Sequence, residues 1–249
     1  MLCVYMLASF RGHCGWQERS NMVRAFALSF YCPIVYVSLF LPPSPFSGGE
    51  IEERMTEESV PLVIVFDLDG TLWAPEMYEL WGGGGAPFRA DPSDPNGAFD
   101  RAGTNVRLLG ETRELLQKLS TDPKWSSTSL AISSTCDEPR WAMELLQLFQ
   151  FTDSSGRRVP MLSLFGDLVE IYSANKASHH RTILRKLREK EIDVKEDFSQ
   201  FVFFDNQTNN VESVSSIGVT SVYCPRGMVS GVFERGIQQW REKVKRSVL

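Results

Sequence analysis

The sequence has few of the residues that build disulfide-bonded or zinc-bound proteins. It contains 5 cysteines and 3 histidines in 249 residues, and no two cysteines form a Cys-x-x-Cys pair. An odd cysteine count without such pairs argues against a disulfide framework and against a zinc knuckle. Only Cys136 and Cys224 lie beyond the first fifty residues. A reducing compartment therefore suits that part of the chain, although it is not required.

The sequence also lacks an excess of positive charge. It has 26 Lys and Arg against 31 Asp and Glu, a formal net charge of -5. A protein that binds the phosphate backbone of nucleic acids normally presents a basic face. The one dense basic stretch, residues 181–190, carries Arg185, Lys186 and Arg188 at a spacing typical of a solvated helix face. We therefore expect no nucleic-acid partner.

A long uncharged apolar run occurs only near the N-terminus. The run Ala25–Leu41 has 17 residues with Pro33 in its middle. It is at the lower edge of a membrane span and longer than most signal-peptide cores. Its surroundings contain arginines and few acids, which slightly favours an organellar presequence. The alternatives are a signal peptide or anchor, a membrane span, and upstream sequence that is not translated. In the last case, translation would start at Met22 or Met55. We predict an N-terminal extension over residues 1–55, a targeting, membrane or disordered segment. Membrane contact is expected only through residues 25–41, and the location is cytoplasmic or organellar.

From residue 60 onward, short apolar runs alternate with amphipathic stretches. Runs at residues 62–66, 129–132 and 201–204 end abruptly in polar residues, as buried parallel strands do. A weaker strand is predicted at residues 161–165, and another strand at residues 219–223. Helical periodicity is found around residues 115–119, 139–149, 176–187 and 233–244. The alternation predicts one α/β domain over residues 60–249 with a parallel central sheet.

The stretch from Trp73 to Gly110 has no sustained period. It contains four consecutive glycines from Gly82 to Gly85, and several prolines follow. Such residues favour turns and irregular structure. We predict an elaborated loop, with the glycine run as a flexible insertion near the mouth of a site. The stretch is too short for a full cap domain, so the site is expected to be open.

Polar residues follow the ends of three predicted strands. Asp67 and Asp69 follow the first strand, Ser134 ends the second, and Asp205 and Asn206 follow the strand at residues 201–204. Open α/β sheets bind ligands outside the carboxyl ends of their strands. We therefore expect these side chains to meet in one site.

The spacing of Asp67 and Asp69 suits phosphoryl transfer by two carboxyl groups. One carboxylate can attack phosphorus, while the second protonates the leaving oxygen and later deprotonates water. Two close carboxylates repel each other, so a divalent cation or Lys176 is expected to keep the first one ionised. Mg²⁺ prefers oxygen ligands, and Asp67, a backbone carbonyl near Asp69, and Asp205 would supply them. Lys176 and Ser134 would hold the phosphoryl oxygens.

The run Val65–Trp73, with the sequence VFDLDGTLW, resembles motif one of the haloacid dehalogenase (HAD) superfamily. Within that superfamily, residues 61–240 resemble the eukaryotic magnesium-dependent phosphatase 1 family. This resemblance rests on Thr71-Leu72-Trp73, Glu170-Ile171-Tyr172 ahead of Lys176, Phe203-Phe204-Asp205, Gly218-Val219-Thr220 and Arg226-Gly227-Met228. It implies a Rossmann-like HAD core with a minimal cap. It also implies these roles: Asp67 as nucleophile, Asp69 as general acid and base, Ser134 as the second-motif hydroxyl, and Lys176 and Asp205 as the third and fourth motifs.

Two positions depart from the family pattern. Asn206 stands where a second acid is usual, and its amide keeps an oxygen but lacks the charge of a carboxylate. Thr135 stands where arginine is usual. Asn210 matches the family and is expected to support the metal's water shell. The expected phosphate-binding residues are Ser134, Thr135 and Lys176, and the expected metal site comprises Asp67, Asp69, Asp205 and Asn206.

Other reactive side chains in the domain are given no chemical role. Cys136 is too close to the next arginine, Arg140, for a thiol-phosphatase loop, so it is expected to be an ordinary residue near the site. His179 and His180 lie on the predicted basic helix, next to Arg181, and are predicted to be solvated surface residues.

The sequence therefore predicts a magnesium-dependent phosphomonoester hydrolase that forms an aspartyl-phosphate intermediate. The expected partners are a phosphorylated small molecule or a phosphoprotein, with phosphotyrosine and sugar phosphates as candidate substrates. The alternative is a catalytically impaired HAD-fold binding protein that has lost turnover through Asn206 and Thr135. The oligomeric state is left open.

Overall fold

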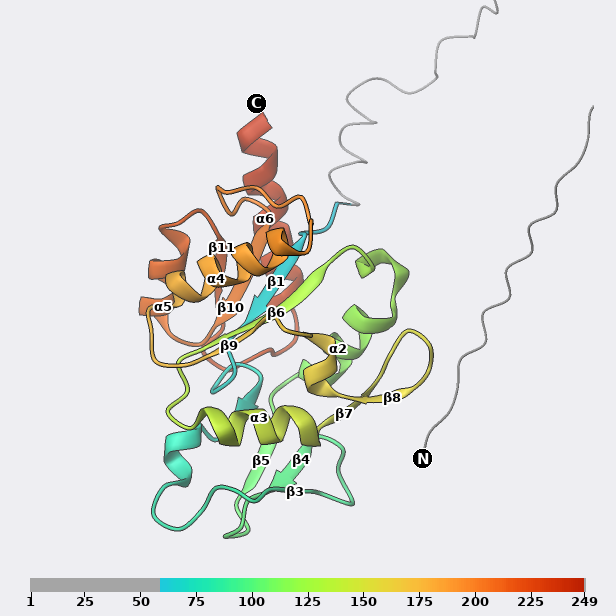
Figure 1. The fold of residues 1–249 in the computed structure, drawn as a ribbon, viewed down its shortest axis with the longest axis vertical. Helices are drawn as coiled ribbons and strands as arrows, with labels where there is room; N and C mark the ends of the chain where they lie inside the picture. Colours follow the sequence, from blue (N-terminus) through green and yellow to red (C-terminus); the bar gives the residue numbers. More distant parts are fainter. Residues whose placement is uncertain (1–58, 249) are drawn as a thin grey trace, which may run out of the picture. The chain divides into compact units, whose positions relative to one another are not determined.

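The computed structural model describes residues 59–248, and a five-stranded parallel sheet forms their centre (Figure 1). The strand order is β11-β10-β1-β6-β9. The bounds are β1 (Val63–Phe66), β6 (Ser129–Ser134), β9 (Val169–Ile171), β10 (Phe201–Asp205) and β11 (Thr220–Tyr223). The predicted extension over residues 1–55 and the apolar run at residues 25–41 lie outside the described residues. No helix within residues 59–248 combines the length and the apolar character that a membrane span requires.

Helices cover both faces of this sheet because successive side chains on each strand point to opposite faces. On one face, Ile64 and Phe66 of β1 pack in a core with apolar residues of α2, α3 and α6. On the other face, Val63 and Val65 pack with α4 and α5. The helix bounds are α2 (Thr112–Thr121), α3 (Pro139–Leu148), α4 (Lys176–Glu189), α5 (Thr208–Ser215) and α6 (Val232–Val248). The parallel α/β fold predicted from the alternating pattern is confirmed.

Aromatic packing fixes β10 against β1. Phe66 and Phe204 are fully buried and stack with ring centroids 5.4 Å apart, and Phe204 stacks in turn on Phe233 of α6 at 5.8 Å. Burying one such ring is worth about 1.5–3 kcal/mol. The two strands whose ends carry Asp67 and Asp205 are thus held side by side by their own hydrophobic residues.

The order of the strands reverses next to β1. From β1 the chain proceeds outward through β6 to β9, then returns through α4 to β10 on the opposite side of β1. In open α/β sheets, the crevice at such a reversal is where ligands bind. The residues that follow β1 and β10 therefore lie at the position that the topology favours for a site.

The prediction of an elaborated loop between Trp73 and Gly110 is wrong. This segment forms a four-stranded antiparallel sheet, in the order β2-β5-β4-β3, and a short 3-10 helix, η1. The bounds are β2 (Trp73–Ala74), η1 (Met77–Leu80), β3 (Arg89–Ala90), β4 (Gly97–Phe99) and β5 (Asn105–Leu108). Strands of two to four residues are too short to show a period of two in the sequence. The buried carboxylate of Asp100 helps to organise the segment, because it accepts hydrogen bonds from the backbone N–H groups of Gly85, Ala102 and Thr104.

The prediction of a strand at residues 161–165 is also wrong. Those residues form the 3-10 helix η3 (Met161–Leu164), which follows a hairpin of β7 (Gln150–Thr152) and β8 (Arg158–Pro160). The edge strand is β9, where Glu170 interrupts the apolar residues of a three-residue run. A short edge strand with a central acid has no clear strand signal. One further 3-10 helix, η2 (Pro123–Trp125), follows α2.

Candidate active site

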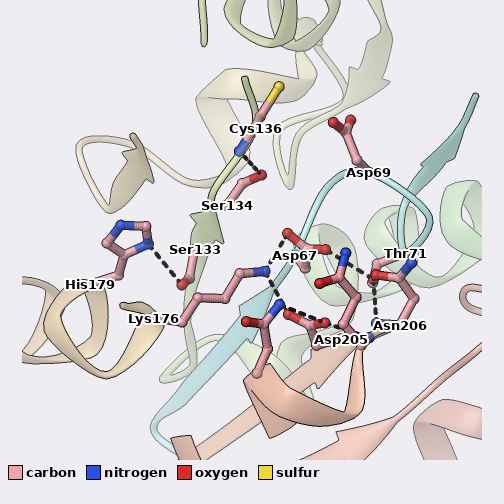
Figure 2. Close-up of polar contacts among 12 residues, drawn as sticks. Asp67, Asp69, Thr71, Ser133, Ser134, Cys136, Lys176, His179, Asp205 and Asn206 are labelled. Atoms are coloured by element: carbon pink, nitrogen blue, oxygen red, sulfur yellow. Dashed lines mark hydrogen bonds and ion pairs between the residues drawn. The ribbon is translucent and has the colours of Figure 1, made fainter. Parts of the chain in front are cut away.

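Lys176 joins the ends of β1 and β10 in a buried ionic cluster (Figure 2). Its Nζ lies 2.6 Å from Oδ1 of Asp67 and 2.5 Å from Oδ2 of Asp205. All three residues are at most 4% exposed. The structure thus brings together three residues that are far apart in the sequence, at the sheet edge where the sequence pattern places them.

One ammonium group serves two carboxylates in this cluster. Burial raises the pKa of Asp67 to about 7, because Lys176 offsets only part of the desolvation and the negative Asp205 adds repulsion. Burial works to lower the pKa of Lys176, but the attraction of the two carboxylates outweighs it and the pKa is raised. The lysine therefore stays charged, and the cluster carries excess negative charge that a bound cation would neutralise.

The first turn of α4 positions Lys176. The preceding residue, Asn175, caps the helix by accepting a hydrogen bond from the Ala177 N–H at 2.8 Å. The N-terminus of a helix carries partial positive charge and unpaired N–H groups, which favour anions. A phosphate group near Lys176 would meet both the ammonium group and this helix end.

Asp69 lies only two residues from Asp67 but in separate surroundings. Figure 2 shows its carboxylate turned away from Asp67 and Lys176. It accepts hydrogen bonds from the indole Nε1 of Trp73 at 2.6 Å and from the backbone N–H of Met77 at 3.2 Å. Burial raises the pKa of Asp69 although both donors oppose the rise. A carboxyl group with a raised pKa is suited to donate a proton near neutral pH.

Asn206 directs its side-chain amide toward the loop that carries Asp67 and Asp69. The backbone N–H of Asn206 donates to the Thr71 hydroxyl at 3.1 Å. One end of its amide lies 3.3 Å from Oδ2 of Asp67 and 3.2 Å from the backbone carbonyl oxygen of Asp69. If nitrogen occupies that end, it donates to both oxygens. If oxygen occupies it, three oxygens face one another, and a cation is needed to stabilise them.

This set of oxygens fits Mg²⁺. Ligand bonds of about 2.1 Å in an octahedron separate neighbouring oxygens by about 3 Å, close to the spacing found here. The set combines a carboxylate of Asp67, a backbone carbonyl of Asp69 and an amide of Asn206. Residues 59–248 contain no cluster of three or more His, Cys, Asp or Glu side chains placed to hold a metal ion. The present set is of another kind, because it depends on a backbone carbonyl and an amide.

Asp205 faces Lys176 rather than this set of oxygens. Its Oδ2 is taken by Lys176, and its Oδ1 accepts from the Gln207 N–H at 2.7 Å and from Asn210 Nδ2 at 3.2 Å. The expectation that Asp205 is a direct metal ligand stays a prediction. Asn210, expected to support the metal's water shell, donates to Asp205.

The residues at the end of β6 face in different directions. Ser134 is buried at the strand end, and its Oγ accepts from the Cys136 N–H at 3.3 Å. The neighbouring Ser133 turns to the α4 side, where its Oγ lies 3.1 Å from Nδ1 of His179. Thr135 lies in the loop that follows, and within residues 59–248 its side chain makes no hydrogen bond. Ser134 is therefore better placed than Ser133 to face a ligand, as Figure 2 shows.

The prediction that His179 and His180 are solvated is wrong, since both are fully buried. Nδ1 of His180 lies 2.8 Å from the Lys176 carbonyl oxygen, and its ring packs edge-on against Phe203 at 4.8 Å. The sequence did contain a signal for His180. It lies one turn after Lys176 and one turn before the buried Ile183, on the same helix face.

A separate hollow of about 560 Å³ lies between the β3–β4 turn, α2 and the β7–β8 hairpin. Its lining includes Asp91, Arg113 and Arg158. Arg113 is already engaged there, because it donates to Asn96 Oδ1 and to the Gln150 carbonyl oxygen. None of the catalytic candidates lines this hollow, so the chemistry is assigned to the ionic cluster around Lys176.

Comparison with known proteins identifies relatives of this chain. A family model described as Acid Phosphatase matches residues 59–243. Magnesium-dependent phosphatase 1 of Homo sapiens is 29% identical over 183 residues, covering 72% of this chain and 86% of that protein. A HAD-like hydrolase superfamily protein of Schizosaccharomyces pombe is 30% identical over 162 residues, covering 64% of this chain and 83% of that protein.

Among solved structures, one similar chain is the N-terminal part of a Bacteroides fragilis protein containing a phosphatase domain complexed with Mg. It is 19% identical with a TM-score of 0.44. The match covers 71% of the present chain and 40% of that longer chain.

Proposed function

Because this chain belongs to the acid phosphatase family and to the HAD-like hydrolase superfamily, we propose that it is a magnesium-dependent phosphomonoester hydrolase that forms a phosphoryl intermediate on Asp67. The observation that carries the proposal is the cluster in which Lys176 bridges Asp67 and Asp205 at the strand-order reversal. The match to the human magnesium-dependent phosphatase supports the choice of metal and reaction.

In the first step, an oxygen of the Asp67 carboxylate forms a bond to phosphorus while the ester P–O bond breaks. Asp69 gives its proton to the leaving oxygen, which departs as an alcohol or phenol. To reach that oxygen, the Asp69 side chain turns away from the Trp73 indole and the Met77 N–H, which hold it in this structure. Lys176 and Ser134 bind the phosphoryl oxygens as charge moves onto them.

In the second step, a water molecule attacks the phosphorus of the acyl phosphate. Asp69, now a carboxylate, takes a proton from the water, and the bond between phosphorus and the Asp67 oxygen breaks. Inorganic phosphate leaves, Asp67 returns as a carboxylate, and Asp69 is again protonated. The raised pKa of Asp69 suits both directions of this proton transfer.

Asp67, the Asp69 carbonyl and Asn206 would hold Mg²⁺. When bound, the ion neutralises charge on the phosphoryl oxygens and keeps Asp67 ionised. Asp205 holds Lys176 in place in this scheme.

The candidate substrates are phosphotyrosine and sugar phosphates. Two aromatic side chains, Tyr78 and Trp81, are 45% and 57% exposed on the segment that directly follows Met77, and their rings meet edge-on. Tyr78 directly follows Met77, whose backbone N–H donates to the Asp69 carboxylate. An exposed aromatic pair beside the proton donor can stack on an aromatic leaving group, which favours an aryl phosphate.

The test is hydrolysis of para-nitrophenyl phosphate and phosphotyrosine by the full chain, with Mg²⁺ or with EDTA. The proposal predicts Mg²⁺-dependent release of phosphate and a hydroxylamine-labile phosphoprotein after acid quenching. Loss of both signals in Asp67→Asn would assign the intermediate to Asp67. An inactive protein that still binds Mg²⁺ and phosphate would instead support the alternative, a HAD-fold binding protein.

A further inference from the structure

Two neighbouring serines end β6, and their side chains point to opposite faces of the sheet. Ser134 faces the proposed phosphate site, whereas Ser133 faces α4, where its Oγ lies 3.1 Å from Nδ1 of His179 (Figure 2). Ser133 and His179 are both fully buried. The proposed mechanism uses neither side chain, so this buried polar pair calls for a separate explanation.

The contact between β6 and α4 is otherwise apolar. Ala131 lies two residues before Ser133 on β6, and it packs in one core with Ile183 and Leu187 of α4. Apolar packing is not directional, so it allows a helix to make small shifts along a sheet. A hydrogen bond requires a defined distance and angle. The bond between Ser133 and His179 therefore fixes where the first turn of α4 lies along β6.

The pair connects the two groups that would hold the phosphoryl oxygens. On the strand, Ser133 directly precedes Ser134. On the helix, His179 follows Lys176 by three residues, a spacing that places both on one helix face. From there, Nζ of Lys176 reaches Oδ1 of Asp67 at 2.6 Å. Sliding of α4 along β6 would thus change the distance between the Lys176 ammonium group and the Ser134 hydroxyl.

Tyr172, directly after β9, contacts both sides of this connection. Its ring packs edge-on against the His179 ring with centroids 4.2 Å apart, and its backbone N–H donates to the Ser134 carbonyl oxygen at 3.2 Å. Burial and the positive charge of Lys176 lower the pKa of His179. The imidazole therefore stays neutral, held between Ser133 and Tyr172, and adds no second positive charge beside the ammonium group.

We propose that the Ser133–His179 pair positions the phosphate-binding groups: it fixes the start of α4 against the end of β6, so that Lys176 and Ser134 converge on one phosphoryl group. The inference rests on the proposed function, which assigns Lys176 and Ser134 to the phosphate. Ser133 and His179 act through these neighbours, so both are positioning residues. Groups at a reacting centre have to be held within about 0.5 Å of their productive positions, and a misplacement of about 1 Å can cost about 100-fold in rate.

The experiment measures binding of inorganic phosphate to the full chain by titration calorimetry at saturating Mg²⁺, together with kcat and KM for para-nitrophenyl phosphate. His179→Leu removes the hydrogen bond and keeps an apolar side chain in the core. It should weaken phosphate binding about 10-fold or more and lower kcat/KM by about 10–100-fold. His179→Asn should lie closer to the wild type, because its amide can still pair with the Ser133 hydroxyl.

His180→Leu is the matched control. It removes an equally buried imidazole from the same helix, but the hydrogen bond of His180 is made within α4, to the Lys176 carbonyl oxygen. This variant should change phosphate binding less than about 3-fold. A loss equal to that of His179→Leu would overturn the inference, because removal of any buried imidazole from α4 would then be sufficient.

A double-mutant cycle and urea denaturation separate positioning from stability. Ser133→Ala should reproduce the loss seen in His179→Leu, and the double variant should lose little more than either single variant, because all three lack the same bond. Additive losses would overturn the inference. A pair that only stabilises the fold would lower the folded fraction and leave the phosphate affinity and KM of the folded protein unchanged, which would also overturn it.

Failure of the proposed function gives a different result. A wild-type protein that binds phosphate in a His179-dependent way but hydrolyses no phosphomonoester would overturn the proposed function and leave this inference standing. A wild-type phosphatase whose phosphate affinity and kcat/KM are the same in His179→Leu and Ser133→Ala would overturn this inference alone.

Discussion

Asp67 and Asp69 are separated by one residue, yet different parts of the molecule position them. Asp67 extends from the central sheet and is fixed by Lys176 between two parallel strands. Asp69 is fixed by Trp73 and Met77, which belong to the inserted segment with the antiparallel sheet. The proposed nucleophile is thus positioned by the central α/β sheet, and the proposed proton donor by the insertion that follows β1. Changes in the insertion can alter proton transfer without moving the nucleophile.

The sharpest test of this division is Asp67→Asn. The variant should lose hydrolysis by about 10⁴-fold or more, the size seen when the nucleophile of a covalent mechanism is removed. It should remain folded, because the amide removes a buried negative charge from a cluster with too many. Steady-state kinetics and circular dichroism measure the two effects. A variant with a tenth of the wild-type activity would rule out Asp67 as the nucleophile.

Phe204→Ala tests whether the sheet itself supports the Asp67 side. Removing this fully buried ring should lower the free energy of unfolding by about 3–5 kcal/mol, because a cavity opens beneath the strand ends. Phe99→Ala is the matched control, since Phe99 is only half-buried in the inserted sheet. Urea denaturation should show a clearly smaller loss for Phe99. Equal losses would mean that the two sheets contribute alike to stability.

Trp73→Phe tests the Asp69 side alone. It removes the indole N–H that donates to the Asp69 carboxylate and keeps an aromatic ring. Asp69 leaves this donor before it protonates the leaving oxygen, so kcat/KM at the pH optimum should change less than about 10-fold, although a hydrogen bond to a charged group contributes about 1.5–3 kcal/mol. The donor favours the ionised form, so its removal should raise the pKa of Asp69 further and move the basic limb of the pH profile upward. An unshifted limb would show that Trp73 does not tune the proton donor.

His180→Phe concerns the turn of α4 that carries Lys176. Burial lowers the pKa of His180 to about 3 from an ordinary value of 6.5, so the unfolded chain takes up a proton in this range and the folded chain does not. Stability from this group is therefore complete above pH 6.5 and is lost as the pH falls toward 3, by at most about 1.4 kcal/mol per pH unit. Denaturation at about pH 7 and about pH 5.5 should show a smaller acid-induced loss in the variant. The same loss in both proteins would assign acid sensitivity to other groups.

The sequence was sufficient to predict the elements with long or uniform patterns. The apolar runs that end in Asp67 and Asp205, and the helices starting at Pro139 and Lys176, were placed correctly because their burial is nearly continuous or strictly periodic. The resemblance to the HAD superfamily and to the magnesium-dependent phosphatase family is confirmed by the comparisons. The roles of the individual site residues remain predictions that the experiments above address.

What the sequence could not predict depends on contacts between distant segments. The inserted sheet has strands too short for periodicity, and it is organised in part by the buried Asp100, whose partners are backbone groups. The contact of Asp205 with Lys176 depends on side-chain rotamers.

The return of the chain from β9 to β10 also bears on how the protein folds. β1 and β10 are neighbours in the sheet, but all of β6 to β9 and α4 lies between them in the sequence. Contacts between segments this distant form slowly, because a long loop must close before they contribute. The Lys176 cluster is therefore completed only when β10 joins β1, and a growing chain has no assembled site until residue 205 and its neighbours have been synthesised. Phosphatase activity would then report completed folding, and recovery of activity during refolding should follow, not precede, formation of the central sheet.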